Sequence, residues 1–178
     1  MYYKVLKNDG SCVNGGKGKW HLPKGNKPGR WMPEIEGELE LCENGYHICR
    51  REDLVNWLDE AIFEVEFKGE IIEGDGKCVV RKARLVRKLD TWNEKTARLF
   101  AADCAERVLP IFEREYPDDD RPRKAIQAAR DFVDGKISRD ELYAAGEAGY
   151  VAASAAWSAA GDSERAWQTG KLFEYLEE

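Results

Sequence analysis

The chain has few histidines, no closely paired cysteines and no long apolar run. His21 and His47 are its only histidines, and no Ser/His/Asp or Cys/His spacing rises above chance. No apolar run approaches the roughly 20 residues of a membrane-spanning helix. The N-terminus, MYYKVLKND, lacks the apolar core of a signal peptide. We therefore expect a cytoplasmic protein without a membrane segment, and the weight of this pattern is against an enzyme.

The cysteines are odd in number and scattered along the chain: Cys12, Cys42, Cys49, Cys78 and Cys104. This pattern is typical of free thiols in a reducing compartment. Cys42, His47 and Cys49 could form part of a zinc site with Cys12 or Cys78, but zinc sites favour C-x2–4-C pairs and the chain has no CxxC. We expect buried thiols beside an ordered histidine, with no metal and no cofactor. The zinc alternative stays open.

Charge is distributed unevenly along a composition that is otherwise ordinary for a globular protein. Hydrophobic residues make up 43% and charged residues 35% of the chain. Residues 1–90 carry 16 basic and 16 acidic residues, whereas residues 91–178 carry 12 and 18 and hold the whole net charge of −6. Any nucleic-acid role therefore belongs to the first half.

The first half has the patterns of short strands. Apolar and polar residues alternate most clearly in 61–69, and Asn44-Gly45 is a strong turn signal. The basic residues of 77–89 suit an exposed edge strand. We predict a β-rich domain over residues 1–90, with strands at 2–7, 34–41, 61–69 and 77–89 and a short helix at 51–58.

A loop over residues 14–33 interleaves basic and aromatic side chains. Such a loop can form a stacking and phosphate-binding platform. The alternative is a long surface loop held by two buried tryptophans. The candidate binding residues are Lys17, Lys19, Trp20, His21, Lys24, Lys27, Arg30 and Trp31.

The second half has the patterns of helices. Thr91-x-x-Glu94 and Ser138-x-x-Glu141 are capping boxes. Every fourth residue from 92 to 112 forms a packing ridge, which consists of Trp92, Thr96, Phe100, Cys104, Val108 and Phe112. Pro110 should kink the first helix. We predict a four-helix antiparallel bundle-like domain over 91–178, so that the fold class is α+β. Its third helix runs to about residue 160, and its fourth, 163–176, buries Trp167, Gly170, Phe173 and Leu176.

An acidic turn separates the first two helices. Asp118, Asp119 and Asp120 precede Pro122 and should cap the second helix, because acids suit the positive end of the helix dipole. The nearby Arg121 and Arg123 should form ion pairs that fix this corner. The three aspartates are also our candidates for partner contacts.

The sequence of this half resembles a known family. The residues that carry the resemblance are Asp103-Cys104-Ala105, the run RVLPIFE at 107–113, Pro117-Asp118-Asp119 and RPRKAI at 121–126. They are similar to the helical domain of immunity proteins, which occurs in bacterial toxin–immunity loci and in phage genomes. The resemblance covers about residues 92–160, and residues 1–90 resemble the first part of phage-borne proteins. It implies an inhibitor or binding partner.

We hypothesise a non-catalytic, protein-binding inhibitor of the immunity type or a phage-encoded counter-defence protein. Its acidic half would occupy a basic surface of a host, toxin or defence protein. The first alternative is a nucleic-acid or nucleotide binder that uses loop 14–33. The second is an enzyme, because the region around Gly45-Tyr46-His47 resembles small ADP-ribosyltransferase folds. That family needs a first-strand His or Arg where this chain has Lys4, and its catalytic glutamate would be Glu64 or Glu66.

Overall fold

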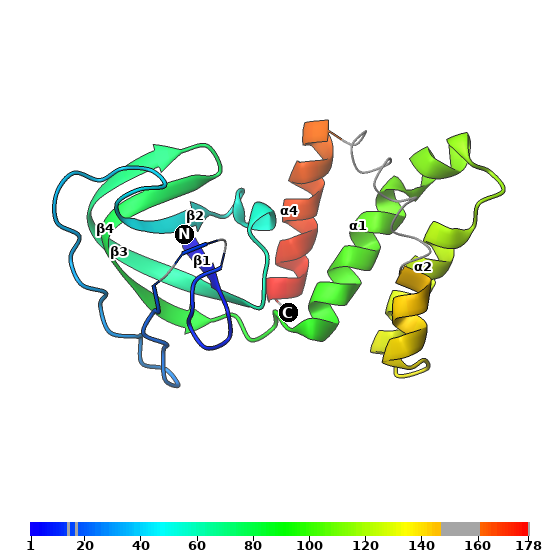
Figure 1. Ribbon diagram of the computed structural model, residues 1–178, viewed down its shortest axis with the longest axis horizontal. Coiled ribbons are helices and arrows are strands. Elements are labelled where there is room, and N and C mark those ends of the chain that lie inside the picture. The colour runs from blue at the N-terminus through cyan, green and yellow to red at the C-terminus, as the bar shows by residue number, and fades with distance from the viewer. Residues whose placement is uncertain (14, 17, 147–160, 178) are drawn as a thin grey trace. The chain divides into compact units, whose positions relative to one another are not determined.

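The computed structural model describes residues 1–13, 15, 16, 18–146 and 161–177. The chain divides into two compact units, Met1–Asn93 and Glu94–Glu177. The first is built from strands and the second from helices (Figure 1). The fold is therefore α+β, as predicted from the sequence.

The first unit is a closed antiparallel barrel of four strands. These are β1 (Tyr2–Leu6), β2 (Tyr46–Arg50), β3 (Ala61–Gly74) and β4 (Lys77–Lys88), in the order β1-β2-β4-β3. The short helix expected at 51–58 is a single 3-10 turn, Leu54–Asn56.

The prediction that 77–89 forms an exposed edge is wrong, because β4 has a strand on each side. Three of its arginines instead pair with glutamates of β3, across the β3–β4 hairpin. Arg84 Nη2 lies 2.6 Å from a carboxylate oxygen of Glu66, and Arg87 Nη2 lies 2.5 Å from one of Glu64. These arginines of β4 therefore form ion pairs with acidic residues of β3 instead of marking an unpaired edge.

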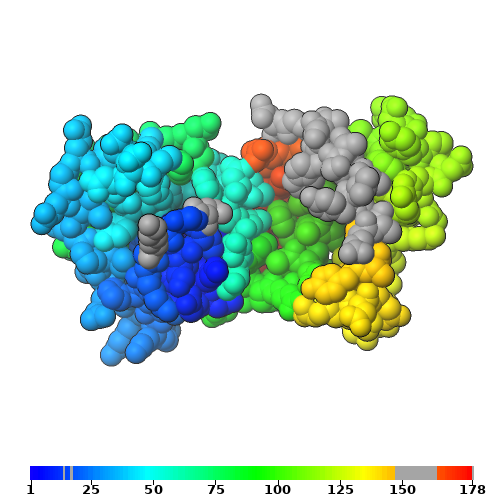
Figure 2. All heavy atoms as spheres, viewed as in Figure 1, coloured from blue at the N-terminus to red at the C-terminus, as the bar shows by residue number. Residues whose placement is uncertain are grey.

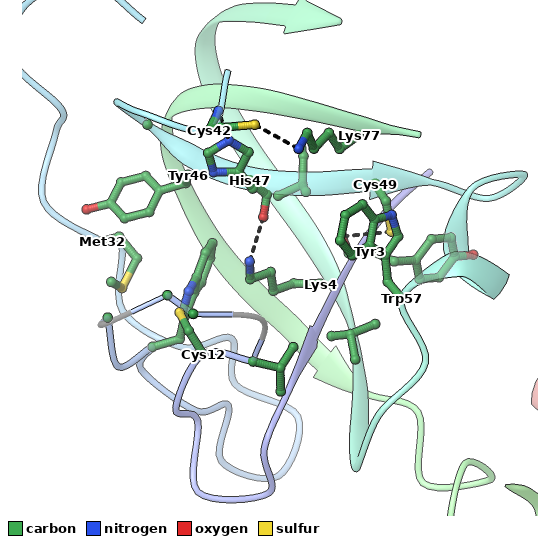
Figure 3. A pocket seen from close by; sticks show the side chains of 18 of the residues that line it. Tyr3, Lys4, Cys12, Met32, Cys42, Tyr46, His47, Cys49, Trp57 and Lys77 are labelled. Carbon is green, nitrogen blue, oxygen red and sulfur yellow. Dashed lines mark hydrogen bonds between the residues drawn. The ribbon is translucent and has the colours of Figure 1, made fainter. Parts of the chain in front are cut away.

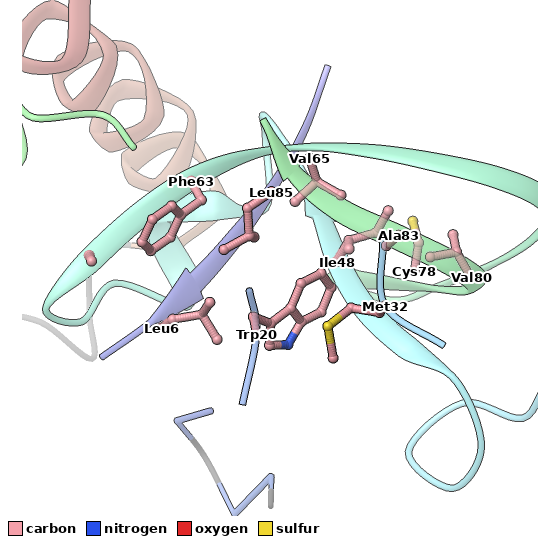
Figure 4. Close-up of a cluster of buried hydrophobic side chains, with 11 residues drawn as sticks. Leu6, Trp20, Met32, Ile48, Phe63, Val65, Cys78, Val80, Ala83 and Leu85 are labelled. Carbon is pink, nitrogen blue, oxygen red and sulfur yellow. The ribbon is translucent and has the colours of Figure 1, made fainter. Parts of the chain in front are cut away.

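Aliphatic and aromatic side chains fill the barrel interior (Figure 4). Leu6, Phe63 and Leu85 are at most 1% exposed. Strand side chains alternate between two faces. On β1, Tyr2 and Leu6 pack against this core, so Lys4, the residue between them on that face, also points inward.

The segment between β1 and β2 completes the hydrogen bonding of β4. The ladder between β2 and β4 covers only Cys78 to Val80 of β4. Beyond it, backbone N–H groups of the segment donate to carbonyls of β4: Gly29 to Leu85, Met32 to Ala83 and Ile35 to Arg81, at 2.9, 2.9 and 3.0 Å. In Figure 2 this segment, blue to cyan, forms part of the visible face of the barrel unit.

The strand expected at 34–41 does not form. Residues 34–41 make one isolated bridge, from Glu40 to Asn44. Side chains hold the rest of the segment, because the Asn44 amide donates to the carbonyls of Glu36 and Glu38 and Arg81 Nη1 donates to those of Ile35 and Gly37. Alternation of apolar and acidic residues was therefore misleading here.

The second unit contains α1 (Glu94–Glu115), α2 (Arg121–Val133), a helical stretch at 139–146 and α4 (Gly161–Glu177). Helix α1 begins at Glu94, three residues after the expected cap at Thr91, and the Glu94 carboxylate accepts hydrogen bonds from Arg98 and Arg139. The capping box at Ser138 and Glu141 is confirmed, since the Glu141 carboxylate accepts the Ser138 N–H at 2.8 Å.

A polar centre joins the helices of this unit. Asp103 of α1 accepts hydrogen bonds from Arg130 of α2 at 2.9 Å and from the Tyr175 hydroxyl of α4 at 2.8 Å. Gly170, expected to be buried, is exposed, whereas Leu172 and Phe173 are at most 3% exposed. Part of the third predicted helix lies outside the described residues, so the four-helix bundle stays a prediction.

Phe63→Ala tests the barrel core. Removal of this ring should lower the free energy of unfolding by about 3–5 kcal/mol, because it leaves a cavity in a closed interior. Phe67→Ala on the same strand is the matched control, since Phe67 is only partly buried and should cost less. Urea denaturation of the full chain measures both, and equal losses would contradict this account of the core.

Candidate functional site

A cavity of about 570 Å³ opens in the barrel unit, lined by β1, β2 and the segment between them (Figure 3). Its position follows from the strand pairing. The register of β1 and β2 consists of Tyr2 opposite Arg50 and Tyr3 opposite Cys49. Beyond Tyr3 the two strands separate, and the cavity lies where this ladder stops.

Lys4 bridges the two strands where the ladder ends. Its Nζ donates a hydrogen bond of 2.8 Å to the backbone carbonyl of His47, the dashed line at the centre of Figure 3. The ammonium also lies 5.5 Å from the ring centroid of Trp20. Desolvation lowers the pKa of Lys4. No carboxylate of the described residues lies within 4.0 Å of Nζ, so the charge has no anionic partner there.

His47 is held as the neutral imidazole. Its Nε2 accepts the backbone N–H of Cys42 at 2.8 Å, and an N–H group can only donate, so the proton sits on Nδ1. Desolvation, aided by the charges of Lys4 and Lys77, lowers the pKa of His47. Cys42 has a φ of +71°, and its Sγ lies 2.9 Å from Lys77 Nζ.

The thiols near the cavity do not form a metal centre among the described residues. These residues contain no group of three or more His, Cys, Asp or Glu side chains able to hold an ion. Burial raises the pKa of Cys49 to about 12, so this thiol stays protonated and is a poor nucleophile. Cys49 Sγ lies 3.6 Å from the Tyr3 carbonyl.

Both tryptophans of loop 14–33 contact other side chains of the protein through their rings. Trp20 is 4% exposed and packs edge-on against Tyr46, with the ring centroids 5.4 Å apart. Trp31 contacts two cations, with Lys68 Nζ at 4.7 Å and Arg84 Cζ at 4.6 Å from its ring centroid. A bound base would therefore compete with contacts that the protein itself makes to both rings.

The basic residues of the loop differ in their surroundings. Lys19 pairs with Asp9 at 3.0 Å, and His21 Nδ1 lies 3.4 Å from an Arg30 nitrogen. Lys24 and Lys27 are exposed, and Lys17 lies outside the described residues. The loop thus presents Lys24, Lys27 and Arg30 to solvent. None of these three residues lines the cavity.

The acidic corner between α1 and α2 is largely paired. Both oxygens of Asp119 accept hydrogen bonds from Arg121, which lowers the pKa of Asp119 to about 2. Asp119 also accepts the backbone N–H of Arg121, whereas Asp120, which occupies the N-cap position, makes no side-chain cap. Asp120 pairs with Lys124 at 2.8 Å. The corner is therefore capped by one aspartate rather than three.

The ion pairs predicted for the corner are confirmed. Arg121 binds Asp119, and Arg123 Nη2 lies 2.6 Å from a Glu113 carboxylate oxygen.

Glu64 and Glu66, the candidate catalytic glutamates of the enzyme alternative, pair with arginines of β4. Neither of them lines the cavity. Sequence reasoning missed Lys4, although its place between Tyr2 and Leu6 on an alternating strand was a signal that it points inward.

Comparison with known families assigns both halves of the chain. Residues 1–97 match the model of a domain of unknown function, DUF7666. The chain belongs to the DUF7666 family. Residues 87–166 match the model described as "Imm-5 like putative immunity protein", which confirms the predicted resemblance and its order behind a β-rich part. No curated protein and no solved structure matches the chain.

The helices of the DUF7666 protein give no candidate for a membrane span. Among the described residues, no helix is both long and apolar enough to cross a bilayer.

The protonation of His47 is open to direct measurement. We expect NMR of the imidazole nitrogens to give a midpoint below 6.5, with the neutral ring protonated on Nδ1. The unfolded chain binds this proton at a higher pH, so His47 should destabilise the fold as the pH falls below about 6.5. His47→Gln assigns the signal against His21, and a midpoint at or above 6.5 would refute the Cys42 hydrogen bond.

Proposed function

We propose that this DUF7666 protein is a non-catalytic inhibitor, of the immunity type or a phage-encoded counter-defence protein, whose helical unit binds a partner protein. The match of residues 87–166 to the immunity family carries this proposal. The family relation supports a protein partner in general. The binding surface and the chemistry of the partner are argued next from the described residues.

Two large side chains near the C-terminal end of α1, Ile111 and Tyr116, are exposed to solvent. Tyr116 is 54% exposed and Ile111 is 37% exposed. The Tyr116 ring stacks on Phe112 with centroids 4.9 Å apart, and Phe112 is 6% exposed. A tyrosine held in place by a buried neighbour loses little conformational freedom on binding, and tyrosine is enriched among the residues that dominate interface energies.

Two acidic side chains lie close to Tyr116 in the sequence. Glu115 and Asp118 are exposed, and neither forms an ion pair with another described residue. Asp119 and Asp120, by contrast, are paired within the corner. Residues 91–178 carry 18 acidic against 12 basic residues. Charge complementarity therefore favours a partner with a basic face, such as the nucleic-acid-binding surface of a toxin or defence protein.

Tyr116→Ala in the full chain tests this surface. We expect it to weaken partner capture by about 30-fold, the loss that corresponds to a hot-spot contribution of about 2 kcal/mol. Tyr143→Ala is the matched control, because Tyr143 is 56% exposed and lies elsewhere in the same unit. Quantitative mass spectrometry of proteins captured from host lysate at moderate salt measures the three forms in parallel.

Two results would contradict the proposal. One is that the unaltered chain retains no protein specifically at moderate salt. The other is that Tyr116→Ala and Tyr143→Ala retain the same protein equally well. The identity of the captured protein is measured together with its yield. A captured protein without a basic face would contradict the proposed charge complementarity.

The second candidate function is nucleic-acid or nucleotide binding by loop 14–33. The observation that favours it is a tight turn in which Lys24 and Lys27 exchange backbone hydrogen bonds of 3.0 and 3.1 Å. Both side chains are exposed, as is Arg30, and neither lysine pairs with an acid among the described residues. Because both tryptophans have other contacts, such binding would rest on phosphate charge rather than on base stacking.

The triple variant Lys24→Glu, Lys27→Glu, Arg30→Glu tests this candidate. A mobility-shift titration with single-stranded DNA should show binding that weakens with salt. The slope of log K against log salt is negative, and the variant should reduce its magnitude by about 0.7 for each phosphate that it no longer neutralises. Lys136→Glu, a change in the helical unit, should leave the titration unaltered. A flat titration of the unaltered chain at low salt would remove this candidate.

A further inference from the structure

Lys4 is a cation at an interior position of a closed barrel. It lies on the inward face of β1 between Leu6, which belongs to the core, and Tyr2, which packs against it. Its Nζ reaches the cavity and donates to the His47 carbonyl. An ammonium group has three N–H donors, and this carbonyl is the hydrogen-bond acceptor that the described residues supply.

A desolvated ammonium without a counter-charge is costly. A buried charge is normally paired with an opposite charge or is neutralised. Lys4 has no carboxylate partner among the described residues, and desolvation already lowers its pKa. An anion bound in the cavity would remove this cost, since it would supply both the missing charge and the missing acceptors.

The remaining charges around the cavity do not oppose an anion. Among the described lining residues, the other ionic side chains are Lys77 and Glu43, and Glu43 is exposed. His47 is neutral, because its Nε2 accepts the Cys42 N–H. The Cys49 thiol keeps its proton, with a pKa of about 12. The field inside the cavity is therefore set mainly by the lysines.

Aromatic and apolar side chains form the rest of the wall. Trp20 and Tyr46 both line the cavity, and their rings meet edge-on with an interplanar angle of 69°. The Tyr46 hydroxyl donates to the Pro33 carbonyl at 2.8 Å, so its polar end is already satisfied. Met32 lies beside Tyr46 in Figure 3 and beside Trp20 in Figure 4. A volume of about 570 Å³ falls within the range of small-molecule sites.

We propose that the barrel cavity binds a small organic anion, whose oxyanion group pairs with the Lys4 ammonium and whose apolar, ring-bearing body packs against Trp20, Tyr46 and Met32. The site lies wholly within the DUF7666 domain. It is independent of the protein partner proposed for the helical unit, and it is tested on the purified full chain alone.

A pair of probes separates charge recognition from apolar binding. The first, 8-anilinonaphthalene-1-sulfonate, carries an oxyanion on a ring-bearing body. The second, N-phenyl-1-naphthylamine, has the same body without the sulfonate. The fluorescence of each probe is titrated with the full chain to give a dissociation constant and a stoichiometry. We expect the anionic probe to bind saturably at one site and more tightly than the neutral one.

Lys4→Gln removes the charge but keeps an amide N–H that can donate to the His47 carbonyl. It should weaken the anionic probe at least about tenfold, as expected for loss of a charge-assisted hydrogen bond, and leave the neutral probe within about twofold. Lys4→Met serves as a second variant if the glutamine form fails to fold, as judged by circular dichroism. Lys24→Met, at an exposed position away from the cavity lining, is the control and should change neither probe.

Three outcomes would overturn the proposal. The unaltered chain could fail to bind the anionic probe at a saturable site. The Lys4 variants could weaken both probes equally, which would mean that Lys4 shapes the cavity without recognising charge. Lys24→Met could weaken the anionic probe as much as Lys4→Gln, which would place the anion on the outer surface. A selective loss with the Lys4 variants supports the site.

Discussion

Closure of a barrel with only four strands is the constraint on which the rest of the first unit depends. Strands β3 and β4 are long, whereas β1 and β2 have five residues each. The short strands cannot satisfy every backbone group of the long ones. The segment between β1 and β2 therefore takes over hydrogen bonds of β4 at residues 81–85, and Lys4 spans the gap in which β1 and β2 separate. The long irregular loop and the cavity are two consequences of the same mismatch.

Local patterns in the sequence predicted much of the architecture. The β-rich first half, the clean strand from Ala61, the capping box at Ser138 and the ion pairs of Arg121 and Arg123 follow from alternation, cap chemistry and charge. These signals involve residues that are near one another in the chain. They were sufficient for the α+β class, whereas the family of the second half was predicted from its resemblance to immunity proteins.

Features that depend on contacts between residues far apart in the chain could not be predicted from local sequence patterns. The segment 34–41 alternates like a strand, yet side chains of Asn44 and Arg81 hold its carbonyls. The basic run of β4 resembles an edge, but three of its arginines pair with glutamates of the neighbouring strand β3. The role of Lys4 depends on barrel closure and on where the β1–β2 ladder ends, neither of which is encoded in the spacing of nearby residues.

The two units divide the proposed roles between them. The helical unit offers an exposed tyrosine with acidic neighbours in the sequence, which suits a protein surface. The barrel offers a cavity with an uncompensated cation, which suits a small anion. The pKa of Lys4 tests both the proposed anion binding and the burial of this side chain in the barrel. Selective labelling of lysine and NMR titration of the Lys4 side chain should give a pKa below 10.5 in the free protein, and that pKa should rise when 8-anilinonaphthalene-1-sulfonate binds. A value at or above 10.5 in the free protein, unchanged by the probe, would contradict the account.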